Sequence, residues 1–185
     1  MGYINRELTF DSDKIYFTRE EKIFEVMMDW EDEIMKASAD YICENGGDIL
    51  EIGFGMGISA GYIQANNINS HTIIEKHPQI IEKLKAWAQD KSNVIIIEGD
   101  WYDVRNLLST YDGILFDTYE DFNDNYWKDT LPSLTKKGTK TTWFNNGYNK
   151  DVYNIDGVEF DVININPPPN SYLNSNTYYL PKKQF

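Results

Sequence analysis

Three glycines at alternate positions follow an apolar run and a carboxylate in ILEIGFGMGISA, residues 49–60. Glycines let the backbone turn sharply and approach a ligand, and free N–H groups at the next helix start can bind an anionic group. A dinucleotide fingerprint would need its third glycine at position 58, where the chain has Ile58. Glu51, two residues before Gly53, opposes a pyrophosphate but favours a ligand that carries an ammonium and a sulfonium. The stretch therefore favours an adenosyl cofactor of the methyltransferase type over a dinucleotide.

Acidic residues also end the next two apolar runs. Glu75, in HTIIEK, lies 22 residues after Gly53, where a carboxylate can accept hydrogen bonds from both ribose hydroxyls of an adenosyl group. An exposed carboxylate at a helix start near Pro78 is the alternative. Asp100 ends NVIIIEGD and Trp101 follows it, so that an adenine can stack there and donate its amino hydrogens. Packing of Trp101 in the core is the other reading.

Two carboxylates mark a possible reacting end. Asp117 follows the apolar run of GILFDTYED, over the crevice where open α/β sheets bind ligands. Glu31 lies four residues from both Met27 and Met35, and it interrupts an apolar stripe in a helical pattern. A bound cation, a lysine partner or a position at the rim of the core would each explain Glu31.

The elements that must position these residues alternate along the chain. Apolar residues at helical spacing predict a helix over 19–43, with Thr18 and Glu21 as a capping box and Gly46-Gly47 at its end. Strand-like runs and helical segments then alternate, in the order 48–53, 58–66, 71–76, 78–90, 93–100, 104–111, 111–119, 124–138 and 140–145. This pattern predicts a doubly wound, Rossmann-like α/β fold with a mostly parallel sheet. The tail, 151–185, reads as added antiparallel strands.

Composition limits the class of protein. A chain of 185 residues with 41% hydrophobic residues suits a single domain, 1–185, with an amino-terminal arm at 1–17. It has no apolar stretch long enough for a bilayer and no visible signal peptide, so we expect a cytoplasmic protein. A formal charge of −13 argues against nucleic acid and anionic membranes as partners. The charge reflects solubility, although it would also suit a cationic ligand.

Cysteine and histidine offer no further chemistry. Cys43, the single cysteine, lies in the helical pattern and is expected to be a small buried hydrophobe. His71 and His77 have neither the spacing nor the companions of metal ligands, and we expect them in solvent-facing turns. No metal requirement is predicted.

Five stretches together resemble a known family: VMMDWEDEIM, LEIGFGMGI, IIEK, GDWYD and GILFDTY. They are similar to guanidinoacetate N-methyltransferase and its relatives that methylate arginine on the guanidino group. The order and spacing match over about 24–145, and YYLP near the end resembles the last strand of the family. The resemblance implies an enzyme that uses S-adenosylmethionine.

The resemblance also implies roles for individual residues. Glu31 and Asp117 would bind the guanidinium, with Asp117 as the proton acceptor, and Glu75 would bind the ribose. Met35, Gly53, Phe54, Gly55, Met56, Gly57, Ile58 and Trp101 would line the cofactor. The residues themselves add Glu51 and Asp100 to the expected cofactor-binding set, together with Asp117. The loop after the fifth strand would present backbone N–H groups to the far end of the substrate, at Asn145, Asn146 and Gly147.

Departures from the family leave the substrate open. The loop FNNGYN differs in sequence, and the usual helix before the last strand pair has no room. Guanidinoacetate, arginine, another guanidino metabolite or an arginine within a peptide all remain candidates, for a monomer or a homodimer. A non-catalytic module that binds S-adenosylmethionine and an NAD-dependent oxidoreductase are the other classes, the latter disfavoured by the glycine spacing.

Overall fold

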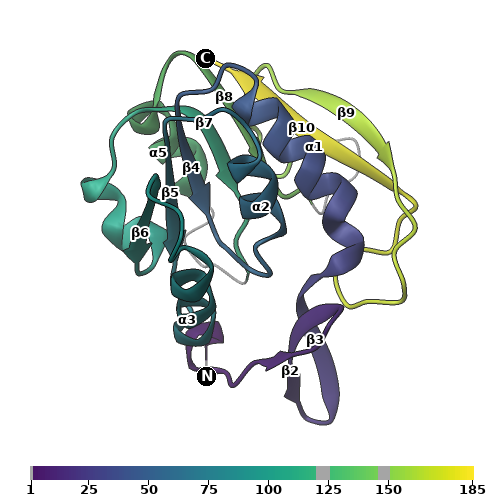
Figure 1. The fold of residues 1–185 in the computed structure, drawn as a ribbon. Coiled ribbons are helices and arrows are strands. Elements are labelled where there is room, and N and C mark those ends of the chain that lie inside the picture. Colours follow the sequence, from purple (N-terminus) through teal and green to yellow (C-terminus); the bar gives the residue numbers. More distant parts are fainter. Residues whose placement is uncertain (1, 120–125, 146–150) are drawn as a thin grey trace.

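Short runs of isoleucine, leucine and phenylalanine form the centre of a seven-stranded sheet in the computed structural model, which describes residues 2–119, 126–145 and 151–185 (Figure 1). Five parallel strands come first, namely β4 (Asp48–Ile52), β5 (Ser70–Glu75), β6 (Val94–Glu98), β7 (Tyr111–Phe116) and β8 (Thr135–Trp143). The tail adds two antiparallel strands, β9 (Glu159–Asn164) and β10 (Thr177–Gln184). The strand order β6-β5-β4-β7-β8-β10-β9 confirms the predicted doubly wound fold.

Helices cover both faces of this sheet, because side chains of the central strands alternate between two apolar layers. Leu50 and Ile52 pack with Trp127 on one face, whereas Ile49 packs with Ile42 on the other. The Ile49 face carries α1 (Asp32–Cys43), α2 (Ile58–Gln64) and α3 (Pro78–Trp87). The opposite face carries α4 (Trp101–Val104), the short 3-10 turn η3 (Arg105–Leu107) and α5 (Trp127–Leu134).

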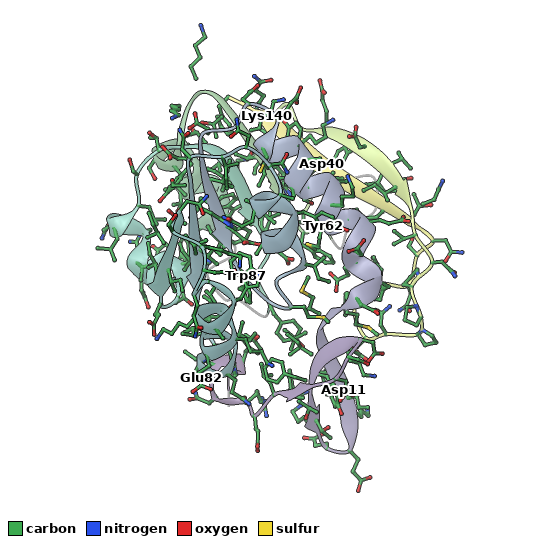
Figure 2. The ribbon with its side chains drawn as sticks, in the orientation of Figure 1. Asp11, Asp40, Tyr62, Glu82, Trp87 and Lys140 are labelled. Carbon is green, nitrogen blue, oxygen red and sulfur yellow. The ribbon has the colours of Figure 1, made fainter. Side chains whose placement is uncertain are left out.

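Side chains fill the space between the layers (Figure 2), and a polar contact joins two neighbouring helices. The hydroxyl of Tyr62 on α2 donates to the carboxylate of Asp32 in the first turn of α1, with O···O distances of 2.8 and 2.9 Å. This contact holds α2 beside α1, and α2 is the helix that follows the glycine stretch. The contact between α1 and α2 therefore helps to position the glycine loop that precedes α2.

The first half of the helix predicted over 19–43 is wrong. A 3-10 turn, η1 (Tyr3–Asn5), precedes a three-stranded antiparallel sheet of β1 (Thr9–Phe10), β2 (Lys14–Arg19) and β3 (Lys22–Met28). Glu20 and Glu21 have φ angles of 50° and 63°, so they form the tight turn of a hairpin rather than a helix start. Thr18 consequently pairs with Ile23 across the hairpin instead of capping a helix. A second 3-10 turn, η2 (Asp29–Glu31), leads into α1.

Other boundaries follow the sequence more closely. α1 ends at Cys43, which is buried, and Gly46 follows with a φ of 63°. The helical segment expected over 124–138 ends at Leu134 in the structure, because the extended backbone of β8 already begins at Thr135. Residues 120–125 lie outside the described part of the chain.

The two histidines are not in solvent-facing turns. His71 lies inside β5, between β4 and β6, and is fully buried. His77 precedes α3, where the ring of Tyr3 covers it at a centroid distance of 4.9 Å. Among the described residues, no group of three or more His, Cys, Asp or Glu side chains is arranged to hold a metal ion. In the same part of the chain, no helix is both long and apolar enough to cross a membrane.

Candidate active site

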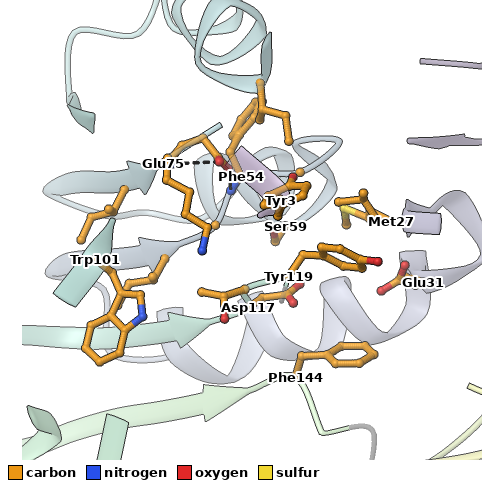
Figure 3. A pocket seen from close by; sticks show the side chains of 18 of the residues that line it. Tyr3, Met27, Glu31, Phe54, Ser59, Glu75, Trp101, Asp117, Tyr119 and Phe144 are labelled. Carbon is orange, nitrogen blue, oxygen red and sulfur yellow. Dashed lines mark hydrogen bonds between the residues drawn. The ribbon is translucent and has the colours of Figure 1, made fainter. Parts of the chain in front are cut away.

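A cavity of about 270 Å³ opens at the carboxyl ends of five neighbouring parallel strands (Figure 3). Each strand contributes a residue at or just after its end, and these residues are Gly53 (β4), Glu75 (β5), Gly99 (β6), Asp117 (β7) and Phe144 (β8). Carboxyl ends of parallel strands share one edge of a sheet, which is why residues so far apart in sequence meet here. Segments outside this edge complete the wall with Tyr3, Glu31 and Tyr172.

The glycine loop shapes one end of the cavity through its backbone. Gly53 has a φ of 94°, and its N–H donates to the carbonyl of Ile74 at 2.9 Å. A Cβ at position 53 would lie 1.8 Å from the carbonyl oxygen of Asp117, so only glycine lets these two strand ends approach each other. A Cβ at Gly55 would likewise lie 2.5 Å from the Sδ of Met27. The loop is thus a close backbone cradle of the kind that adenosyl and nucleotide ligands use.

Glu75 is fixed at the cavity wall by three backbone donors. Its Oε2 accepts the N–H of Phe54 at 3.0 Å, the contact drawn in Figure 3, and its Oε1 accepts the N–H groups of Lys76 and His77, both at 2.8 Å. The side chain is only 5% exposed, so the carboxylate does not rotate freely. An ionised carboxylate has about four lone-pair sites, which leaves capacity to accept ligand hydroxyls.

Glu51 lies beneath the cavity rather than in its wall. The side chain is fully buried on the face of the sheet covered by α2. Its Oε1 accepts the hydroxyl of Ser59, and its Oε2 lies 2.9 Å from Nε2 of His71. Ser59 itself lines the cavity. Any effect of Glu51 on a ligand would therefore pass through Ser59 or through the loop that both support.

Several other residues predicted to bind the cofactor do not line the cavity, namely Met35, Met56, Gly57 and Ile58. Met35 on α1 is buried against Met27, and the N–H of Met56 contacts the Sδ of Met27 at 3.1 Å. Gly57 precedes α2, and Ile58 is its first residue. Phe54 and Gly55, by contrast, line the cavity directly.

Trp101 lines the cavity beyond β6, and Asp100 precedes it at the start of α4. The Trp101 ring lines the cavity but is 2% exposed, and it packs edge-on against Phe116 and Trp127 at 5.2 and 6.1 Å. Trp101 is thus a core residue that also reaches the cavity, and stacking of an adenine on it stays a prediction. Asp100 caps α4 by accepting the N–H of Tyr102 at 3.0 Å, and its carboxylate lies 3.7 Å from Nζ of Lys76.

Glu31 and Asp117 lie at the other end of the cavity, and Figure 3 shows their carboxyl groups on either side of the Tyr119 ring. Oε1 of Glu31 accepts the N–H of Met28 at 2.8 Å and the hydroxyl of Tyr172 at 2.6 Å. Burial raises the pKa of Glu31 to about 7, although both hydrogen bonds act to lower this pKa. Glu31 is therefore a carboxyl group whose charge a cationic ligand would stabilise.

Asn145 points away from the cavity. Its N–H donates to the hydroxyl of Tyr178 at 2.7 Å, and its Nδ2 donates to the carbonyl of Tyr179 at 3.1 Å, so both groups bind β10. Asn146 and Gly147 lie outside the described residues. A role of this loop in binding the far end of a substrate remains a prediction.

Among the wall residues that the sequence did not predict are Tyr3 and Tyr172, because neither lies in a recognisable local motif. Tyr3 reaches the cavity from η1 and packs against Tyr119 at a centroid distance of 5.0 Å. Tyr172 comes from the segment between β9 and β10, 141 residues beyond Glu31. Only tertiary packing brings either side chain to the site.

The family model described as guanidinoacetate N-methyltransferase matches residues 17–146. Protein arginine N-methyltransferase 2 of Saccharomyces cerevisiae is 35% identical over 222 residues, covering 99% of this chain and 52% of the relative. The protein of the same name from Kluyveromyces lactis is 34% identical over 220 residues, covering 99% and 53%. The chain thus spans about half the length of these curated relatives.

Solved structures show the fold alone, at low identity. Precorrin-6y C5,15-methyltransferase from Geobacter metallireducens aligns with a TM-score of 0.65 and 12% identity, over 83% of this chain and 88% of that one. Aeropyrum pernix fibrillarin, solved with bound S-adenosyl-L-methionine, aligns with a TM-score of 0.57 and 15% identity, over 91% and 81%. These likenesses agree with the doubly wound fold of the chain. The chain belongs to the guanidinoacetate N-methyltransferase family.

Proposed function

We propose that this chain transfers a methyl group from S-adenosylmethionine to a guanidino nitrogen, with an arginine side chain as the preferred substrate class. The observation that carries the proposal is one cavity with two different ends, a glycine cradle with Glu75 at one end and the carboxylates Glu31 and Asp117 at the other. The names of the relatives favour arginine in a protein, whereas the family description favours the small compound guanidinoacetate.

The cofactor end fits an adenosyl group in its shape and in its hydrogen-bond acceptor. The close backbone of the glycine loop leaves room beside Phe54, and the fixed carboxylate of Glu75 can accept ribose hydroxyls. The aromatic edge of Trp101 offers an apolar surface for a purine. When bound, S-adenosylmethionine supplies an electrophilic methyl group on a sulfonium.

The substrate end suits a planar cation. A guanidinium has a pKa above ~12, so its nitrogen has no useful lone pair until a proton leaves or is shared. Glu31 and Asp117 can bind two sides of the guanidinium by charge-assisted hydrogen bonds and hold one nitrogen toward the cofactor end. Asp117 would accept, on a carboxylate oxygen, the proton that this nitrogen loses when the sulfonium gives up its methyl group to it. The rings of Tyr119 and Phe144 line the same end and give it an apolar wall.

A substrate screen with isotopically labelled S-adenosylmethionine tests this proposal. The purified chain is offered guanidinoacetate, free arginine, agmatine and an arginine peptide, with the same peptide carrying lysine as the matched control. We expect label on a guanidino nitrogen, most efficiently in the arginine peptide, and none in the lysine peptide. Methylation of non-guanidino compounds alone would show that the substrate class is wrong.

A binding experiment separates the other classes of protein. Titration with S-adenosylmethionine and with NAD is expected to give saturable binding of the first ligand alone. Binding without methyl transfer to any guanidino compound would favour a non-catalytic module. Saturable binding of NAD would instead favour an oxidoreductase.

A further inference from the structure

The segment between β9 and β10 has a built-in turn next to the cavity. Asn170 follows three consecutive prolines, and its Oδ1 accepts the N–H groups of Tyr172 and Leu173 at 3.0 and 2.7 Å. Its Nδ2 donates to the carbonyls of Pro168 and Leu173 at 2.9 and 2.8 Å. One asparagine side chain thus fixes the backbone on both sides of itself.

Two neighbouring contacts hold this turn against the amino-terminal half of the chain. The hydroxyl and the N–H of Ser171 both donate to Oε2 of Glu25 on β3, at 2.5 and 3.1 Å. Leu173 is 6% exposed and packs in the cluster that contains Met27. Tyr172, between these anchors, is therefore held over the residues that follow β3.

Tyr172 determines where Glu31 can place its carboxylate. Its ring stacks on Trp30 at a centroid distance of 5.9 Å and an interplanar angle of 24°, and its hydroxyl donates to Oε1 of Glu31 at 2.6 Å. The N–H of Met28 donates to the same oxygen. No described residue donates a hydrogen bond to Oε2, so this is the oxygen left for a ligand in the cavity.

We propose that Tyr172 is a positioning residue for Glu31, which fixes Oε1 so that Oε2 is presented to the guanidinium of the substrate. The proposal rests on the proposed function for the identity of the substrate. Burial and the charge of Glu31 raise the pKa of Tyr172 far above its usual value, so the hydroxyl stays protonated and acts as a donor.

The charges around Glu31 set the sign of the expected pH effect. The titratable groups that influence this region are Tyr172 itself, Tyr178 on β10 and Asp117 after β7. The hydrogen bond from Tyr172 lowers the pKa of Glu31, because it stabilises the carboxylate. Removal of the hydroxyl will therefore raise the pKa of Glu31, and ionisation will require a higher pH.

The test compares Tyr172→Phe with Tyr179→Phe, which removes a hydroxyl from β10 where the ring faces Phe160 instead of the cavity. For Tyr172→Phe we expect the KM of the guanidino substrate to rise roughly 10- to 100-fold, the range for a hydrogen bond to a charged group. The acidic limb of the kcat/KM profile should move to higher pH, and the Kd of S-adenosylmethionine should stay the same. Tyr179→Phe should match wild type in all three measurements.

A carbon-13 NMR titration of the Glu31 carboxyl group provides a readout that needs no substrate, with the signal assigned through Glu31→Gln. The midpoint should be higher in Tyr172→Phe than in wild type. Ser171→Ala, which loosens the segment without changing the cavity wall, should raise KM in the same direction by a smaller factor. An unchanged Glu31 midpoint in Tyr172→Phe would overturn the positioning role, even if the protein methylates guanidino compounds as proposed. Absence of guanidino methylation by wild type would instead refute the proposed function.

Discussion

The two ends of the cavity are built in different ways. At the cofactor end, the glycine loop and Glu75 come from adjacent parallel strands, and backbone N–H groups hold the carboxylate in place. At the other end, Glu31, Asp117 and Tyr172 come from three distant segments, and one side chain holds another. A site made of backbone tolerates changes in outer side chains, whereas a site made of side-chain contacts changes its specificity when a single hydroxyl is lost.

Asp117→Asn should give the largest effect, because it removes the proposed proton acceptor. Methyl transfer is expected to fall by about 10²–10⁴-fold, the range for general acid–base catalysis, while cofactor affinity stays nearly constant. Single-turnover transfer at saturating cofactor and substrate measures the chemical step. Asp103→Asn, at an exposed position on α4, is the matched control. A wild-type rate in Asp117→Asn would exclude Asp117 as the acceptor.

Gly53→Ala disturbs the backbone at the cofactor end. The φ of 94° and the predicted contact of 1.8 Å between Cβ and the carbonyl oxygen of Asp117 leave no space for a methyl group. We expect the free energy of unfolding to fall by about 2–5 kcal/mol, from backbone strain together with overpacking. Chemical denaturation and titration with S-adenosylmethionine measure the two losses. Unchanged stability and affinity would mean that the strand ends are farther apart than in the structure.

Glu75→Ala separates a ligand contact from a merely acidic strand end. We expect S-adenosylmethionine to bind more weakly by roughly 1.5–3 kcal/mol, the range for hydrogen bonds to a charged group. Glu98→Ala is the matched control, because Glu98 pairs with Glu75 in the neighbouring strand but forms an exposed ion pair with Lys85. Calorimetric titration of both variants gives the difference. Equal affinities in the two variants would remove Glu75 from the cofactor site.

The meeting of the glycine loop and Glu75 at one sheet edge could be predicted from the sequence, because the signals for both are local. The glycine spacing and Glu75 follow from strand ends that adjacent apolar runs define, and the structure places them at one sheet edge. The substrate end could be predicted from the sequence only in part. Glu31 was identified, but on a helix that does not extend back to it, because the turn at Glu20 and Glu21 contains no glycine or asparagine to signal a hairpin.

The rest of the site could not be predicted because local patterns were misleading or missing. The apolar spacing of Ile23, Met27 and Trp30 fits a helical period, although β3 extends to Met28. Tyr172 lies in a tail segment without regular structure, and its role depends on the Ser171 contact with a strand formed about 146 residues earlier. Glu51, predicted to bind the cofactor, does not line the cavity, since the pleat of β4 turns its side chain toward His71.

The pH dependence of substrate binding probes the substrate end alone. Because burial raises the pKa of Glu31 to about 7, affinity for a guanidino substrate should fall as the pH drops below 7, by up to about tenfold per pH unit. The pH dependence of folding stability has the opposite sign. The contribution of protonated Glu31 is fully present below its unfolded value of 4.5 and is lost as the pH rises through about 7. Glu31→Gln should bind substrate weakly with no such dependence, whereas binding of S-adenosylmethionine should not follow this titration in either protein.

Gly61→Ala should produce the smallest effect, and it marks where the glycine cradle ends. Gly61 lies inside α2, one turn beyond Gly57, and a Cβ there would meet no atom within 4 Å. Alanine restricts the unfolded chain and favours the helix, so we expect a gain of about 0.5–1 kcal/mol in the free energy of unfolding. For a chain of this size, the thermal midpoint should rise by about 1–4 °C, with the Kd of S-adenosylmethionine unchanged. Weaker cofactor binding in Gly61→Ala would extend the cofactor end into α2, and the cradle could then no longer be assigned to the loop after β4 alone.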